Sequence, residues 1–177
     1  MLLCAGNNEF IKGALPIGVG LIESAINLTR LSLMHPPQFL LFVGTAGSYG
    51  KAKIFDIIES KSAANIEHSF LLKSAYTPLN NFITTAEDVS HETIVNSSNY
   101  ITASKKLSEQ FLQLNLSIEN MEFFSVMRVA KEFNIPCGGV FVITNYCYED
   151  AHKEFQKNQK KALLILEDFL SGKGLIQ

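Results

Sequence analysis

The sequence predicts a three-layer α/β/α fold with a central mixed sheet. Short apolar segments and longer amphipathic segments alternate along the whole chain, which is typical of a sheet with helices on both faces. Of the 177 residues, 47% are hydrophobic and 18% are charged, so the chain can bury a substantial core. No repeat, low-complexity tract or linker interrupts the sequence. We therefore predict a single domain over residues 1–177.

Four segments are expected to form buried strands, because they are short and rich in branched or aromatic residues. They are Leu2–Ala5, Phe39–Gly44, Lys53–Glu59 and Cys137–Thr144. Weaker strand signals cover Ile66–Ser74, Phe82–Thr85 and Thr93–Val95.

Four segments are expected to be helical. The first, Val19–Met34, has a broad apolar face and ends before two prolines, which cannot continue a helix. The other three predicted helices are Lys105–Gln113, Met121–Phe133 and Asp150–Ser171. The last of these is followed by Gly172, a residue that commonly ends helices.

Composition narrows the class of protein. A formal net charge of -2 gives no reason to expect a nucleic-acid partner. The longest apolar runs have the length of strands, far short of the roughly 20 residues that span a membrane, and the first residues do not resemble a secretory signal. The three cysteines form no CxxC pair and the four histidines lack metal-ligand spacing. We therefore expect a cytoplasmic protein without a metal site.

Polar or glycine-rich turns follow several of the predicted strands, and this is where open α/β sheets bind ligands. Each turn also has a purely structural explanation, such as glycine for close packing or asparagine for a turn. In the run from Ser117 to Phe123, Glu122 could interact favourably with a helix dipole or accept two sugar hydroxyls. The turns are Gly18-Val19-Gly20, Gly44-Thr45-Ala46-Gly47-Ser48, the run from Ser117 to Phe123, and Val142-Ile143-Thr144-Asn145.

The segment IENMEFFSVMRVAKEFNIPCGGVFVITN, from Ile118 to Asn145, resembles the purine nucleoside phosphorylase and methylthioadenosine nucleosidase superfamily. In that family a Met-Glu pair opens a helix, an FNIP-like turn follows, and a strand ends in Ser-Asp or Thr-Asn. The turns at 18–20 and 44–47 resemble the family's GIG and GSAG turns, and 93–102 resembles its base-binding loop. The chain looks like a shortened member, with only residues 7–17 between the first strand and the GIG-like turn. Where the family has Glu-Met-Glu, this chain has Asn120-Met121-Glu122, with Glu119 one place earlier.

The resemblance implies a role for each matching position. Glu122 would bind the ribose hydroxyls and Met121 would pack beneath the sugar, while Tyr100 would stack on a purine. The Ile101 backbone would touch the edge of the base, and Asn145 would hydrogen-bond it near N7. The residues implied on the nucleophile side of the sugar are Thr45 and its neighbour Ala46, together with Gly18 and Gly20.

The resemblance implies cleavage of the N-glycosidic bond of a purine nucleoside, and two nucleophiles remain open. We expect a glycosyltransferase that phosphorolyses inosine- or guanosine-type substrates to base and ribose 1-phosphate, with phosphate as co-substrate and no cofactor. Its cationic group would be Arg30, Arg128 or Lys12. The first alternative is a hydrolase in which Glu9 activates water. The second is a protein that binds nucleosides without turnover.

Two further expectations concern the substrate and the assembly. Thr144-Asn145 resembles the Thr-Asn pair of the family members that prefer 6-oxopurines. His91 precedes the presumed base-binding loop and could either reach the substrate or lie on the surface. The high apolar content and the resemblance together predict a homo-oligomer, a dimer or a trimer.

Overall fold

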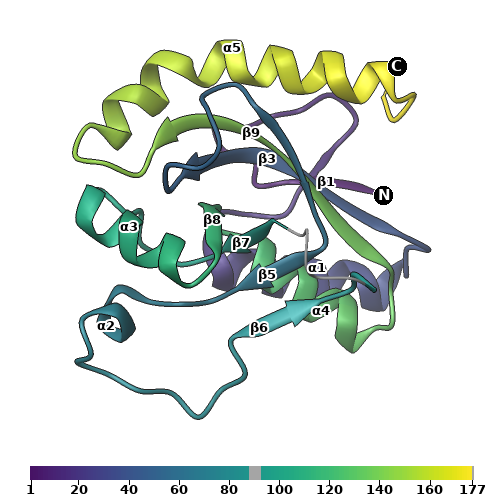
Figure 1. The fold of residues 1–177 in the computed structure, drawn as a ribbon. Coiled ribbons are helices and arrows are strands. Elements are labelled where there is room, and N and C mark those ends of the chain that lie inside the picture. Colours follow the sequence, from purple (N-terminus) through teal and green to yellow (C-terminus); the bar gives the residue numbers. More distant parts are fainter. Residues whose placement is uncertain (88–92, 177) are drawn as a thin grey trace.

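The computed structural model describes residues 1–87 and 93–176, and it has the predicted mixed sheet between two helical layers (Figure 1). The strands are β1 (Leu2–Cys4), β2 (Leu15–Pro16), β3 (Leu40–Ser48), β4 (Ile57–Ser60), β5 (Ser62–Ala64), β6 (Phe82–Thr84), β7 (Ile94–Asn96), β8 (Leu116–Glu119) and β9 (Cys137–Tyr146). The helices are α1 (Gly20–Met34), α2 (His68–Leu71), α3 (Lys105–Gln113), α4 (Phe123–Glu132) and α5 (Ala151–Gly172).

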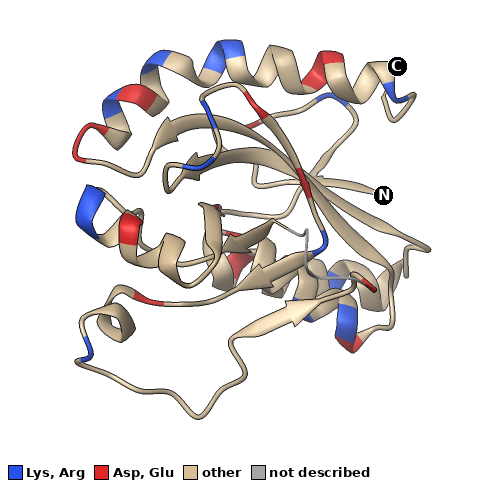
Figure 2. Ribbon diagram, in the orientation of Figure 1, with Lys and Arg blue, Asp and Glu red and all other residues tan. Residues whose placement is uncertain are grey.

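Strand β3 is a central strand of the sheet. It pairs in parallel with β1 and with β9, and its last two residues pair antiparallel with β8. From β8 the sheet continues through β7 and β5 to β6, while β9 also pairs antiparallel with β4. Both β3 and β9 are almost completely buried and carry no charged residue, as their tan ribbons show (Figure 2). Such strands are typical of a sheet covered on both faces.

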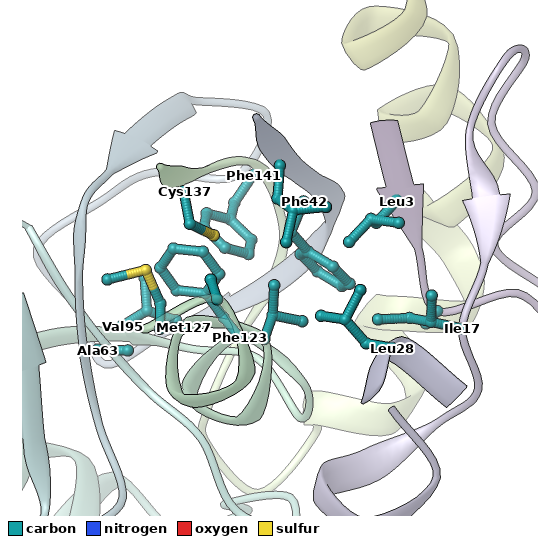
Figure 3. Packing of buried hydrophobic residues seen from close by; sticks show 14 of the residues in the cluster. Leu3, Ile17, Leu28, Phe42, Ala63, Val95, Phe123, Met127, Cys137 and Phe141 are labelled. Carbon is teal, nitrogen blue, oxygen red and sulfur yellow. The ribbon is translucent and has the colours of Figure 1, made fainter. Parts of the chain in front are cut away.

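The two faces of the sheet are covered by different helices. Helix α5 lies over β9 and β3, where Leu166 and Leu170 join a buried cluster with Val140 and Val142 (Figure 1). Helices α1 and α4 cover the other face. There the Phe123 ring of α4 packs against Phe42 of β3 and Phe141 of β9, with ring centroids 6.3 and 5.1 Å away (Figure 3). These apolar contacts hold the sheet, and therefore the ends of its strands, in place.

Most predicted elements are present, with boundaries that differ by a few residues, but Ile66–Ser74 is wrong as a strand. This segment contains the short helix α2, and Lys73 has a positive φ of 56°. Phe70 and Leu72 are left 44% and 63% exposed, while Ile66 and Leu71 are only partly buried against a small cluster. Without neighbouring strands to cover it, an apolar run of this kind gains little from extended pairing.

The exposed apolar side chains of α1 include Ile22, Ile26, Leu33 and Met34. A surface of this kind fits the expected homo-oligomer, which stays a prediction. No helix in the two described ranges combines the length and the apolar character needed to cross a membrane.

Two neighbouring glycines in β9 give a matched test of the core. A Cβ at Gly139 would lie 2.6 Å from the Phe141 ring and 2.7 Å from the Phe123 ring, whereas a Cβ at Gly138 would meet nothing closer than 3.6 Å. Overpacking of this kind typically costs about 1–3 kcal/mol. We expect Gly139→Ala to lower the free energy of unfolding by about that amount and Gly138→Ala to leave it unchanged or slightly raised. Urea denaturation measures both variants, and equal stabilities would contradict this account of the core.

Candidate active site

A cavity of about 310 Å³ opens where the ends of β1, β3, β8 and β9 meet the start of α5. Its volume lies at the lower end of the range for small-molecule sites. Its wall combines apolar side chains with a few polar groups that point inward. The lining residues are Ala5, Gly6, Asn7, Asn8, Glu9, Val19, Thr45, Ala46, Gly47, Ser98, Tyr100, Ile101, Glu119, Asn120, Met121, Glu122, Thr144, Asn145, Ala151, His152, Phe155 and Gln159.

Glu122 lies at the junction between β8 and α4. The Asn120 side chain fixes this junction, because its Oδ1 accepts the N–H groups of Glu122 and Phe123, each at 3.0 Å, and its amide donates to the Thr45 carbonyl at 3.1 Å. Glu122 as a residue is only 3% exposed, and its carboxylate accepts the Gly20 N–H at 2.8 Å. Asn120 therefore stabilises the start of the helix, and Glu122 is free to face the cavity.

Burial raises the pKa of Glu122 to about 7. The Gly20 N–H opposes this rise because it stabilises the ionised form, and the nearby Glu9 carboxylate adds to it. Glu122 therefore titrates near neutral pH, which is common for carboxylates in active sites.

Glu9 reaches the cavity from a tight turn after β1. The Glu9 N–H donates to the Gly6 carbonyl at 3.0 Å, and both Gly6 and Asn7 adopt positive φ angles, of 84° and 59°. Thr45 holds the carboxylate with two hydrogen bonds, one from its N–H at 3.2 Å and one from its hydroxyl. Burial raises the pKa of Glu9, and the Thr45 hydrogen bonds oppose the rise.

Asn145 is turned toward the cavity by an irregularity in the sheet. In the pairing of β3 with β9, Ala46 faces Ile143 and Gly47 faces Asn145, so Thr144 is an extra residue. Bulges of this kind redirect the following side chain. The Thr144 hydroxyl donates to Asn145 Oδ1 at 2.8 Å, and Asn145 Nδ2 donates to the Tyr146 carbonyl at 3.1 Å. The amide is thus held in one orientation and keeps one N–H and one oxygen lone pair for a ligand.

The structure brings most of the predicted site residues together around this cavity. Gly18 and Gly20 are the exceptions, because only Val19 of that turn lines it. The N–H groups at this turn already have protein acceptors: Val19 donates to Glu23, Gly20 to Glu122, and Leu21 to Asn99. The predicted residues that do line the cavity are Glu9, Thr45, Ala46, Tyr100, Ile101, Met121, Glu122 and Asn145.

None of the three cations considered for phosphate lies at this cavity. Lys12, Arg30 and Arg128 are all exposed, and no Lys or Arg is among the described residues that line it. His91 lies outside the described residues.

Sequence reasoning missed the wall that α5 supplies. Ala151, Phe155 and Gln159 line the cavity and are spaced four residues apart, so they share one face of the helix. The spacing can be read from the sequence. Only the packing of α5 against β9, however, shows that this face of the helix borders the cavity. His152 and the turn residues Gly6, Asn7 and Asn8 are also lining residues to which sequence reasoning gave no role.

Three carboxylates, of Glu9, Glu119 and Glu122, share one cavity with a fixed amide and define an α/β protein with an enzyme-like site for a small molecule. The sequence comparison gives the family: the chain belongs to the phosphorylase superfamily, whose family model matches residues 10–171. Among curated proteins, none matches this sequence closely enough to be called a relative.

Solved structures with the same fold include nucleosidases. The D198N mutant of the Helicobacter pylori 5′-methylthioadenosine/S-adenosylhomocysteine nucleosidase, solved with 5′-methylthioadenosine, is 20% identical, with a TM-score of 0.78 over 97% of this chain and 95% of that one. Futalosine hydrolase of Helicobacter pylori is 21% identical, with a TM-score of 0.79 and coverages of 96% and 94%. The 5′-methylthioadenosine/S-adenosylhomocysteine nucleosidase from S. pneumoniae is 11% identical, with a TM-score of 0.70 and coverages of 94% and 97%.

Proposed function

We propose that this protein hydrolyses the N-glycosidic bond of a purine nucleoside and releases the base and the free sugar. The observation that carries the proposal is the Glu9 carboxylate, held by Thr45 inside a cavity whose described lining contains no Lys or Arg. Two of the structurally similar proteins are named as nucleosidases and one as a hydrolase, which supports water rather than phosphate as the nucleophile. This replaces phosphorolysis, our first expectation from the sequence.

The hydrogen-bond donors on the side of the cavity expected to hold the nucleophile argue against phosphate. Phosphate sites use cationic side chains or free backbone N–H groups, often at a helix N-terminus. Here the N–H groups of Gly20 and Thr45 are bonded to carboxylates, at 2.8 and 3.2 Å. A phosphate dianion would have to displace Glu122 or Glu9 and then lie beside their negative charge. A water molecule need not displace either carboxylate and carries no charge that they would repel.

The chemistry follows from the same groups. As the bond between C1′ and N9 breaks, positive charge develops on the sugar, which carboxylates stabilise. Glu122 accepts the two ribose hydroxyls, and Glu9 takes a proton from the water whose oxygen bonds to C1′. The electron pair leaves with the base, which gains a proton from solvent, while Asn145 Oδ1 accepts a hydrogen bond from protonated N7. Asn145 is not itself an acid, so it orients the base rather than protonating it.

Incubation with inosine, with and without phosphate, tests the proposal. We expect hypoxanthine and free ribose to form at the same rate in both cases. Ribose 1-phosphate formed only with phosphate would show a phosphorylase. Binding of nucleosides without release of a base would show a protein that has lost catalysis.

The fixed Asn145 amide also predicts the preferred base. Its free N–H suits the O6 acceptor of a 6-oxopurine, whereas a 6-amino group would place two donors together. An unpaired buried polar group costs about 1–3 kcal/mol, or roughly tenfold to hundredfold in specificity. We therefore expect higher kcat/KM for inosine than for adenosine, and a shift toward adenosine in Asn145→Asp.

The ratio of kcat/KM for the two nucleosides, measured in both proteins, checks this prediction. Asn158→Asp is a suitable control, because Asn158 also binds the end of β9, through the Thr144 carbonyl at 2.8 Å, without lining the cavity. It should leave the ratio unchanged. A wild type that prefers adenosine would contradict the assignment of Asn145 to the edge of the base.

A further inference from the structure

A polar network holds the part of the cavity wall that carries Tyr100 and Ile101. Its centre is the Glu119 carboxylate at the end of β8, a residue that also lines the cavity. Oε1 accepts the Thr102 N–H at 2.9 Å, and Oε2 accepts the Thr102 hydroxyl at 2.6 Å and the Tyr49 hydroxyl at 2.9 Å. Neither ion pair found among the described residues involves Glu119. Hydrogen bonds rather than a cation therefore hold this carboxylate.

The direction of each hydrogen bond can be worked out from its neighbours. The Asn96 amide donates to the Tyr49 hydroxyl at 3.1 Å, while its oxygen accepts the Ile66 N–H. The single Tyr49 proton is therefore left for Glu119. In the same way, the Thr102 hydroxyl gives its proton to Glu119 and accepts from His68 Nε2 at 2.9 Å. The Tyr49 and Thr102 hydroxyls therefore both donate to Glu119, as the Thr102 N–H does, and an ionised carboxylate can only accept.

The network holds one end of a short segment, residues 98–102. Thr102 is completely buried at that end. At the other end, the Ser98 hydroxyl donates to Glu67 at 2.9 Å, and Asn99 Oδ1 accepts the Leu21 N–H of α1 at 2.9 Å. Between the two anchored ends, Tyr100 and Ile101 line the cavity with 72% and 59% of their surface exposed. Large apolar side chains held in the open at a cavity are suited to covering a flat ligand.

We propose that Glu119 is a positioning residue that acts through Thr102 to hold Tyr100 and Ile101 as a preformed wall for the purine. The inference rests on the proposed function for the class of ligand, but it concerns binding rather than the chemical step. A wall that is already ordered does not lose conformational entropy when the base arrives, so releasing it weakens binding. Glu119 and Thr102 should therefore affect KM and Kd much more than kcat.

The test uses formycin A and formycin B, the C-nucleoside counterparts of adenosine and inosine, whose carbon–carbon bond between sugar and base is not hydrolysed. Isothermal titration gives their Kd for the wild type and for Glu119→Gln, which places an amide N–H₂ where donors now converge. We expect Kd to rise about tenfold, corresponding to one lost hydrogen-bonded anchor. KM for the substrate should rise similarly, with kcat changed by less than about threefold.

Thr102 offers a matched pair that separates the network from general stability. Thr102→Val removes the hydroxyl but keeps the shape and the backbone N–H, whereas Thr102→Ser keeps the hydroxyl. The valine variant should weaken formycin binding about as much as Glu119→Gln, and the serine variant should bind like the wild type. Tyr49→Phe, which removes one donor and keeps the ring stacked on Phe111, takes the place of Glu119→Gln if that protein does not fold.

The outcomes separate this inference from the proposed function. A wild type that binds a formycin but releases no base would contradict the proposed hydrolysis, while the changes in Kd would still support the positioning role. Unchanged Kd values in Glu119→Gln and Thr102→Val would overturn the positioning role even in an active hydrolase. Equal weakening in Thr102→Ser and Thr102→Val would also overturn it. A wild type that binds neither formycin would overturn both.

Discussion

Glu122→Gln is expected to lower kcat/KM for nucleoside hydrolysis by about 10²–10⁴ while the protein stays folded. The carboxylate accepts two sugar hydroxyls in the proposed complex, and hydrogen bonds to a charged group contribute about 1.5–3 kcal/mol each. Glutamine keeps one oxygen for the Gly20 N–H, which now donates to Glu122 at 2.8 Å. It loses the negative charge and the second acceptor. The substitution should therefore weaken the interaction with the sugar without destabilising the fold.

Glu23→Gln is the matched control. Glu23 is another carboxylate at the start of α1, where it accepts the Val19 N–H at 3.3 Å, but it is exposed and does not line the cavity. Its kcat/KM should stay near that of the wild type. If Glu122→Gln also keeps near-normal turnover, Glu122 does not bind the ribose.

The raised pKa of Glu122 predicts opposite effects of pH on activity and stability. If the ionised carboxylate binds the sugar, kcat/KM should rise as the pH passes through about 7. In the folded protein this group binds its proton more tightly than in the unfolded chain, so its stabilising contribution is present at low pH and is lost as pH rises through about 7. Glu122→Gln, which carries no charge, should therefore melt at least as high as the wild type at about pH 8. A Tm well below that of the wild type would contradict this.

The layers of the fold were predictable from the sequence because β3 and β9 are short, almost entirely apolar segments and α1 and α5 are long helical segments with clear ends. The weaker strands were not. Strand β8, with the sequence LSIE, is too short and too mixed in composition to be recognised, although Leu116 and Ile118 join the core once it pairs with β7 and β3. Strand β5 consists of one serine and two alanines. For such segments, pairing partners decide the structure more than local preference does.

The candidate site, like the fold, could be predicted from the sequence only in part. Glu122, Met121 and Asn145 are located by motifs near the ends of elements that the sequence marks clearly, and each lines the cavity. The role of Gly20 could not be predicted, because its N–H is bonded to Glu122, a residue 102 positions away. Glu119 had no recognisable role for a similar reason. Its partners Tyr49 and Thr102 come from other parts of the chain, and only the folded structure shows that their hydrogen bonds converge on it.

Glu9→Gln should affect the chemical step itself. If Glu9 removes a proton from the attacking water, its amide counterpart cannot do so, and general-base catalysis is typically worth about 10²–10⁴ in rate. Glutamine can still accept the Thr45 N–H, which now donates to Glu9 at 3.2 Å, so the geometry around β3 should survive. We therefore expect kcat to fall by about 10²–10⁴ with little change in KM or in the Kd for formycin. Glu59→Gln, an exposed carboxylate near Lys173, serves as the control and should change neither.

A second Glu9 variant separates a missing base from a distorted site. Glu9→Ala leaves space where the carboxylate was, and azide, a nucleophile that has no proton to lose, can then attack C1′ directly. The C1′–N9 bond breaks, the base leaves with the electron pair, and a glycosyl azide forms in place of the free sugar. We expect azide to restore base release in Glu9→Ala and to have little effect on the wild type, with the glycosyl azide detected by mass spectrometry. Near-normal kcat in Glu9→Gln would show that water is activated by another group, and a Glu9→Ala protein that azide does not rescue but phosphate does would return the phosphorylase mechanism.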